Sequence, residues 1–363
     1  MKFGLAIFIP ALLYLLLGSP SDYEKHDWKK GIVTSEFIYD SASFPSCHAA
    51  TIAETPDGLI AAWFGGSAEA NPDVCIYTSR NVNGMWTAPE RAADGVINDT
   101  LRYPLWNPVL FQIPDGDLLL FYQTTNEHDD RLGLLKRSQD NGLTWSAADS
   151  LPDGFMGPEK NKPVLLDNGT LLCPSAYRKK CFCVCFNASK DFGKTWELIG
   201  PIHSSSTYTA IQATILTHKN GDLQLLCRSR NSVIPTSWSY DNGKTWSLMQ
   251  SSGLPNNWSG IDAVSLQDGR HLLVYNHVAT PIGARKGHRT PLNVAYSEDG
   301  KKWYAALVLE DSEISQYSYP SVIQSKDGFI HIVYTWRREK IKYVKIDPKQ
   351  LKGKEIVDGK WPM

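Results

Sequence analysis

The chain has 363 residues, a hydrophobic content of 42% and a formal net charge of −1. This length is enough for one large β domain or two ordinary domains, and the apolar content is enough for a buried core. A charge this close to zero, with no block of like charges, gives no reason to expect a nucleic-acid partner or an anionic membrane surface.

The first residues predict an export signal. Lys2 is followed by an apolar run over residues 3–17 and then by small residues. This order is typical of a secretory signal peptide, and the run is shorter than the ~20 residues of a membrane span. We expect a signal peptide over 1–21, a mature domain over 22–363 without a membrane span, and a secreted or periplasmic location. An uncleaved N-terminal anchor is the alternative.

An apolar run, a Gly turn and a second apolar run recur six times along the chain, about 50 residues apart. The six turns are Asp57 and Gly58, Asp115 and Gly116, Asn168 and Gly169, Asn220 and Gly221, Asp268 and Gly269, and Asp327 and Gly328. Asp-Gly and Asn-Gly supply the positive φ that tight hairpin turns need. Each copy therefore predicts a two-stranded hairpin.

A second motif, Ser-x-Asp-x-Gly-x-Thr-Trp, lies between these hairpins. Three good copies occupy 138–145, 189–196 and 239–246, a shortened copy occupies 297–303, and a weaker one occupies 79–86. Each repeat then reads as strand, Gly turn, strand, loop, strand, box, strand. Four strands repeated every ~50 residues are typical of propeller blades. We predict one all-β domain, a six-bladed β-propeller.

These boxes resemble the Asp-box repeats of the sialidase (neuraminidase) superfamily, and the repeats run from about residue 44 to residue 346. We expect the boxes to be structural, because Asp and Ser can bond backbone amides within the turn. Their Trp is expected to pack between neighbouring blades. The resemblance implies a sialidase-like fold of a divergent branch, but a fold does not by itself fix a chemistry.

The seven cysteines cannot all pair within the chain, because their number is odd. Cys181, Cys183 and Cys185 alternate along a predicted strand, without a nearby His that would complete a zinc site. We expect buried free thiols, and we predict neither a metal nor a cofactor.

The repeat geometry predicts which face of the propeller carries a site. In every repeat the Gly turn and the box lie on the same face, so a ligand on the central axis is expected on the opposite face. Cationic and aromatic residues dominate the segments that reach that face. Arg binds carboxylate or sulfate through two parallel hydrogen bonds, and aromatic rings suit a sugar ring. We therefore predict an acidic glycan or oligosaccharide as the partner.

The sialidase resemblance also implies roles for particular residues. Sialidases hold the sugar carboxylate with three arginines. Here His48 stands where the first arginine belongs, Arg228 or Arg230 matches the second, and Arg289 matches the third.

Sialidases also use a Tyr nucleophile activated by a Glu, with an Asp as the acid/base. The matching nucleophile is Tyr319, with Tyr317 as its rival, and Glu69 and Asp73 lie in the loop that carries the acid/base. Gln212 replaces the activating Glu, and a Gln side chain cannot take a proton from a tyrosine.

Further substrate-binding candidates come from the same face of the propeller. They are Arg102, Trp106, Asn107, Lys160, Lys162, Gln212 and His277.

Three functions fit these residues. The first is an exo-acting glycoside hydrolase for a terminal acidic sugar, with Tyr319 as nucleophile or with Glu69 and Asp73 as an acid/base pair. The second is a polysaccharide lyase that cleaves beside a uronic acid by β-elimination, with His48, Lys160, His277 or Tyr319 as the base. The third is a propeller that binds glycans without catalysis.

Overall fold

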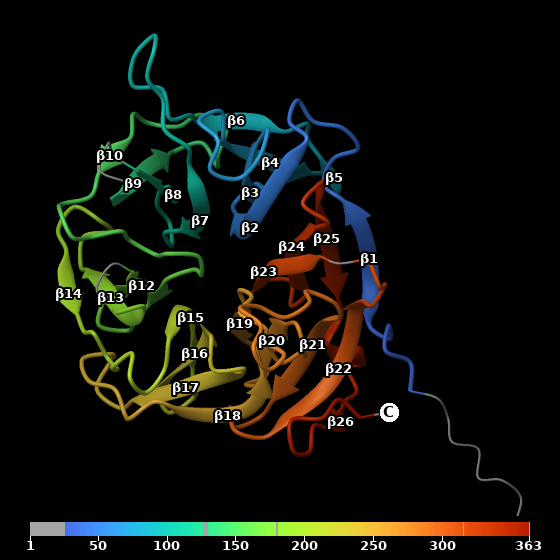
Figure 1. Cartoon of the computed structure of the whole chain (residues 1–363). Helices are drawn as coiled ribbons and strands as arrows, with labels where there is room; N and C mark the ends of the chain where they lie inside the picture. The colour runs from blue at the N-terminus through green and yellow to red at the C-terminus, as the bar shows by residue number, and fades with distance from the viewer. Residues whose placement is uncertain (1–25, 126–129, 179–180, 315, 363) are drawn as a thin grey trace, which may run out of the picture.

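The computed structural model describes residues 26–125, 130–178, 181–314 and 316–362. Six sheets stand around a central axis as a six-bladed β-propeller, as Figure 1 shows. The predicted signal peptide lies outside the described residues. Within them, no helix combines the length and the apolar character that crossing a membrane requires.

The blades follow one another along the chain, and each begins with its innermost strand. Blade 1 holds β2 (Ser46–Thr55), β3 (Gly58–Gly66), β4 (Cys75–Val82), β5 (Met85–Trp86) and β6 (Glu90–Ala93). Blade 2 holds β7 (Trp106–Gln112), β8 (Leu118–Thr125), β9 (Arg131–Ser138) and β10 (Asp149–Ser150). Blade 3 holds β11 (Val164–Leu165), β12 (Leu171–Tyr177), β13 (Cys183–Ser189) and β14 (Glu197–Ile199).

The second half of the ring repeats this order. Blade 4 holds β15 (Ala210–Thr217), β16 (Leu223–Ser229), β17 (Val233–Ser239) and β18 (Gln250–Pro255). Blade 5 holds β19 (Asp262–Ser265), β20 (His271–Tyr275), β21 (Leu292–Ser297), β22 (Trp303–Glu310) and β26 (Lys354–Glu355). Blade 6 holds β23 (Tyr317–Gln324), β24 (Ile330–Trp336), β25 (Lys340–Ile346) and β1 (Ile32–Phe37), and a short 3₁₀ helix, η1 (Pro348–Gln350), follows.

The ring closes through a strand that the repeat pattern did not predict. The strand β1, from the start of the described chain, pairs antiparallel with β25 near its end. It supplies the outer strand of blade 6, so the last blade is built from both ends of the chain (Figure 1).

The boxes are structural, as expected. In the second good copy, Asp191 accepts hydrogen bonds from the Thr195 backbone N–H at 2.8 Å and from the Thr195 hydroxyl at 2.6 Å, while the Ser189 hydroxyl accepts from the Gly193 N–H at 2.7 Å. The Trp196 ring packs against a core cluster formed with blade 2. The motif therefore fixes its own turn and joins two neighbouring blades.

Four innermost strands carry a β-bulge close to the axis. Each bulge contains a non-glycine residue at positive φ, and these are Ala49 in β2, Asn107 in β7, Gln212 in β15 and Tyr319 in β23. An L-residue adopts this conformation only when its surroundings hold it there. Bulges re-aim side chains and concentrate beside functional sites, so the centre of the ring is where a site is expected.

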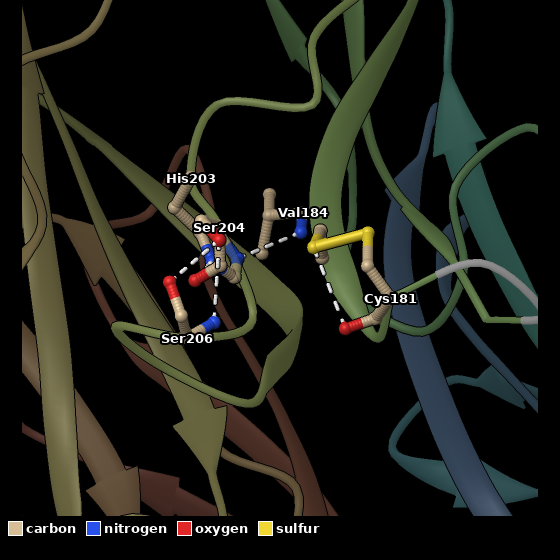
Figure 2. The surroundings of a disulfide bond; sticks show 6 residues. Cys181, Val184, His203, Ser204 and Ser206 are labelled. Carbon is tan, nitrogen blue, oxygen red and sulfur yellow. Dashed lines mark hydrogen bonds between the residues drawn. A yellow bond between two sulfur atoms is a disulfide. The ribbon is translucent and has the colours of Figure 1, made fainter.

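The cysteines correct one expectation. Cys181 and Cys183 form a disulfide, which Figure 2 shows beside the loop that carries His203, Ser204 and Ser206. The other five cysteines are buried free thiols, as predicted. In the described part of the chain, no group of three or more His, Cys, Asp or Glu residues is arranged to hold a metal.

Candidate functional site

Tyr319 lies at the centre of the box-free face. Its side chain comes from the bulge of β23 and is buried, with 8% of its surface exposed. The Tyr319 hydroxyl accepts hydrogen bonds from the Arg228 guanidinium and, at 3.4 Å, from the Gln212 side-chain amide. Arg228 also donates to the Gln212 side-chain oxygen at 2.9 Å. Blades 4 and 6 therefore meet at one phenol oxygen, and no carboxylate of the described residues hydrogen-bonds to it.

Cations dominate the electrostatics around this phenol. Burial alone would raise the pKa of Tyr319, but the charges of Arg228, Arg289 and Arg178, together with the Gln212 hydrogen bond, hold that pKa below its usual value. The Arg289 Cζ atom lies 5.4 Å from the Tyr319 ring centroid. Burial lowers the pKa of Arg289 to about 10, so this guanidinium stays charged at neutral pH. The site therefore favours an anion, whether a phenolate or a bound carboxylate.

A second layer holds Gln212 in place. Glu159 is fully buried, accepts a hydrogen bond from the Gln212 backbone N–H at 3.2 Å and forms an ion pair with Arg178. The carboxylate that this site retains therefore acts on the Gln212 backbone and not on the tyrosine. Because Gln212 sits at positive φ, this contact stabilises a conformation that an L-residue otherwise avoids.

His48 packs directly against the tyrosine, with ring centroids 4.2 Å apart. Its Nδ1 lies 2.9 Å from the Thr335 hydroxyl, while its buried Nε2 finds no partner among the described residues. Burial, reinforced by the nearby charge of Arg338, holds the pKa of His48 well below its usual value. His48 is therefore a neutral imidazole in the place where the sialidase resemblance implies an arginine.

The two predicted acid/base candidates have different surroundings. Asp73 accepts hydrogen bonds from the Ser67 backbone N–H at 2.7 Å and the Ser67 hydroxyl at 2.8 Å. Slight burial acts in the opposite direction, yet these bonds keep the pKa of Asp73 below its usual value. Glu69 is half-exposed and forms an ion pair with Arg338. Asp73 therefore shapes its own loop, while Glu69 presents a carboxylate to the cationic centre.

Two predicted substrate-binding lysines instead join blades. Lys160 is buried and donates to the Asn161 side chain at 2.8 Å, to the Ile261 carbonyl at 3.0 Å and to the Pro320 carbonyl. Lys162 forms an ion pair with Asp262 at 2.8 Å. These contacts tie blade 3 to blades 5 and 6, and the Lys160 bond to the Pro320 carbonyl fixes the backbone next to Tyr319.

The candidates from blade 2 lie beside the centre. Trp106 shares a core cluster with Tyr319, and the Arg131 guanidinium lies 3.6 Å above the Trp106 ring. Asn107, the bulge residue next to Trp106, is 8% exposed. Arg102 donates to the Cys75 sulfur at 3.4 Å, near the loop that holds the acid/base candidates.

Two candidates lie away from the site. The Tyr317 hydroxyl bonds the Ser312 hydroxyl at 2.5 Å, and its ring belongs to the core cluster between blades 5 and 6. His277 lies between the Tyr275 hydroxyl, at 2.6 Å, and the Gly359 carbonyl, at 2.9 Å. Neither side chain reaches the Tyr319 hydroxyl, because each is turned toward a neighbouring core or the C-terminal segment.

Four residues of the site were absent from the predicted set. Glu159 and Arg178 form the second layer in blade 3, Arg338 pairs with Glu69, and Trp258 lies 4.2 Å from the Arg228 guanidinium. Arg178 and Arg338 lie just after the second strands of their blades, β12 and β24, and Arg228 lies near the end of β16. The end of the second strand in each repeat is therefore the sequence signal that identifies Arg178 and Arg338.

Comparisons with known proteins agree with this architecture. A family described as the BNR repeat-like domain matches residues 57–332. A crystal structure of a protein of unknown function from Dyadobacter fermentans is 17% identical, with a TM-score of 0.71 over 88% of this chain and 99% of that chain.

Two sialidase structures are similar as well. The NanB sialidase from Streptococcus pneumoniae is 13% identical, with a TM-score of 0.68 over 87% of this chain and 71% of that chain. The intramolecular trans-sialidase from Ruminococcus gnavus is 16% identical, with a TM-score of 0.67 over 89% of this chain and 99% of that chain. A search of curated protein sequences found no match. At these identities the solved structures establish the fold alone, and the family match shows that the chain is a member of the BNR repeat-like domain family with a sialidase-like propeller.

Proposed function

We propose that this protein is an exo-acting glycoside hydrolase that removes a terminal acidic sugar, with Tyr319 as the nucleophile. The observation that carries the proposal is the buried Tyr319 hydroxyl, which is held by Arg228 and Gln212 among further guanidinium groups. We also propose that residues 1–21 direct the protein to a secreted or periplasmic location.

Binding would begin with the carboxylate of the sugar. Arg228 and Arg289 flank Tyr319, and each has donors suited to two carboxylate oxygens. The Trp258 ring lies 4.2 Å from Arg228 and fixes its guanidinium plane. Burial of these charges strengthens their attraction for an anion, because water screens them less.

Activation of the tyrosine would depend on cations and not on a carboxylate base. The surrounding guanidinium groups lower the pKa of Tyr319, so the phenol can release its proton to solvent before it reacts. The phenolate oxygen would then form a bond to the anomeric carbon while the bond to the leaving oxygen breaks. An uncharged Gln212 suits this scheme, because a carboxylate beside the phenolate would oppose its charge.

Glu69 is the better placed of the two predicted acid/base residues. Both oxygens of the Asp73 carboxylate accept hydrogen bonds from Ser67, whereas Glu69 forms an ion pair with Arg338 at the edge of the site. A substrate carboxylate that attracts Arg338 would free the Glu69 carboxylate to take a proton from solvent and pass it to the leaving oxygen. In the second step Glu69 would take a proton from water, and the water oxygen would displace the tyrosine from the sugar.

His48 supports a second candidate, β-elimination beside a uronic acid. Its buried Nε2 has no partner among the described residues, and its low pKa keeps the imidazole neutral and able to accept a proton. In that reaction His48 would remove the proton next to the sugar carboxylate, and Tyr319 would protonate the leaving oxygen, which leaves a carbon–carbon double bond.

One experiment separates these reactions. The protein is incubated with a pool of acidic oligosaccharides in water labelled with heavy oxygen, and the products are weighed by mass spectrometry. Hydrolysis places the heavy oxygen on the released sugar. Elimination gives a product lighter by one water, with a new ultraviolet absorbance. If no product forms, the protein binds glycans without catalysis, and both proposed reactions are wrong.

Two tyrosine variants form a matched pair for the same assay. Tyr319→Phe removes the hydroxyl at the centre, and we expect hydrolysis to fall by about 10³-fold or more. Tyr317→Phe removes a hydroxyl that bonds Ser312 away from the centre, and we expect activity to be retained. Equal activity of the two variants would contradict the assignment of Tyr319.

A further inference from the structure

A second cationic group stands beside the site and takes no part in the scheme above. Arg230 follows β16 two residues after Arg228, so both side chains leave the strand on the same face, about 7 Å apart along the chain. Arg230 is exposed. Among the described residues, its guanidinium has neither an ion-pair partner nor a hydrogen-bond acceptor, and only its backbone N–H is bonded, to the Thr209 carbonyl at 3.0 Å.

Two aromatic rings hold this guanidinium in position. Its Cζ atom lies 4.8 Å from the Trp258 ring centroid and 5.2 Å from the Phe182 ring centroid. The two rings are tilted by 59° with centroids 6.5 Å apart, so they form a corner around the cation. The rings order the Arg230 side chain through cation–π contacts but occupy none of its hydrogen-bond donors.

Both rings are themselves fixed by unusual backbone. Phe182 and Trp258 have φ values of 48° and 59°, in the left-handed region. In the sequence Phe182 stands between Cys181 and Cys183, which form the disulfide, and its carbonyl accepts from the Ala210 N–H at 3.1 Å. The Trp258 backbone N–H donates to the side-chain oxygen of the buried Asn256 at 3.1 Å. Such conformations persist only where the surroundings impose them, and they concentrate at ligand sites.

Trp258 also connects Arg230 to the reaction centre. The same indole contacts Arg228 at 4.2 Å and Arg230 at 4.8 Å, and Arg228 bonds the Tyr319 hydroxyl. The two guanidinium groups therefore share one indole, so a ligand with one acid group on Arg228 can place a second acid group near Arg230.

We propose that Arg230, held by Phe182 and Trp258, binds a second anionic group on the sugar next to the terminal acidic one. The preferred ligand is then an oligosaccharide with acid groups on two adjacent sugars. A carboxylate and a sulfate ester both present the paired oxygens that guanidinium binds. This inference rests on the proposed function for the orientation of the ligand, but it concerns affinity and is measured without turnover.

Calorimetric titration of the full-length protein tests it with a matched set of disaccharides. All share a terminal acidic sugar, either N-acetylneuraminic acid or a hexuronic acid. The second sugar is neutral, carries a sulfate, or carries a carboxylate. Wild type is expected to bind a doubly charged disaccharide about tenfold or more tighter than its neutral-second-sugar counterpart. The sulfated and carboxylated arms show which oxyanion the site prefers.

Arg230→Ala should remove this preference and leave affinity for the singly charged disaccharide unchanged. Arg230→Lys keeps the charge but loses the planar fork, so a partial preference is expected. Arg228→Ala should weaken both ligands alike. Equal binding of all disaccharides by wild type, or an equal loss on both classes in Arg230→Ala, would overturn the inference. If wild type discriminates but releases no product, the inference stands and the proposed hydrolysis fails.

Discussion

Gln212 determines how a proton can leave Tyr319. A glutamate in its place would lie beside both the phenol and Arg228, and it would neutralise the guanidinium that now stabilises a phenolate. With an amide there, the net charge around the phenol remains positive. The lowered pKa of Tyr319 is therefore a property of its arginines, with the Gln212 hydrogen bond as a smaller contribution.

Gln212→Glu should raise the pKa of Tyr319 above its wild-type value, because the new carboxylate would lie about 3.4 Å from the phenol oxygen. If the phenolate is the reacting form, wild-type activity increases as the pH rises through the lowered pKa. The same increase in the variant should come about one pH unit or more later. Ultraviolet titration of the tyrosine and the pH–rate profile measure this shift. The control is Gln112→Glu on the opposite face, and a shift to lower pH in the Gln212 variant would contradict the argument.

At the scale of single elements, the Asp boxes are turns that contribute to stability in a pH-dependent way. Asp191 accepts bonds from the Thr195 N–H and hydroxyl and from the Lys194 N–H at 3.0 Å. Slight burial acts in the opposite direction, but these bonds lower the pKa of Asp191 to about 2. The stability that the ionised carboxylate contributes is present above its ordinary pKa of 3.8 and is lost as the pH falls through about 2.

Asp191→Asn should therefore lower the free energy of unfolding by about 1 kcal/mol at neutral pH, a small amount because water competes for an exposed carboxylate. The difference from wild type should shrink between pH 4 and pH 2. Urea unfolding at several pH values measures it. Asp153→Asn, in an exposed loop outside the boxes, is the control. A deficit that persists unchanged at pH 2 would show that the turn depends on shape and not on charge.

The repeated elements could be predicted because their turns need particular residues. Five of the six hairpin turns place their Gly at positive φ, and in the second turn Asp115 adopts it next to Gly116. Each box needs its Asp, Gly and Trp, so the repeats leave a mark in the sequence. The bulges leave none, because Gln212 and Tyr319 adopt positive φ through tertiary contacts alone. Blade 3 shows a related limit. The repeat places Glu159 on the box-free face, just before the two-residue strand β11, but it does not show that the carboxylate binds the Gln212 backbone and Arg178.

At the scale of the whole molecule, closure of the ring depends on β1. Ile38 lies just after this strand, and its backbone N–H donates to the Ile341 carbonyl at 3.0 Å. Strand alternation then turns the Glu36 N–H, opposite Tyr343, toward β25, and turns the Ser35 N–H toward the free edge. The two neighbouring positions provide a matched test of the closing ladder.

Glu36→Pro removes a ladder hydrogen bond and should lower Tm by roughly 5 °C. Ser35→Pro introduces the same ring at the solvent edge, where no bond is lost, and should have a smaller effect. Thermal unfolding monitored by circular dichroism compares the two variants. Equal melting temperatures would mean that the closing strand contributes little to the cooperative stability of the propeller.

The closure by β1 also sets an order of events during synthesis. The first strand of the described chain leaves the ribosome long before β25, its ladder partner, has been synthesised. Until the final blade emerges, β1 lacks its partner, and the nascent protein is an open arc whose two end blades expose apolar sheet faces. Such exposed apolar surface makes an incomplete chain prone to aggregation. A contact that spans nearly the whole chain is also slow to form. Premature termination late in the message therefore removes more than the last blade: it leaves the first strand without a place to bind.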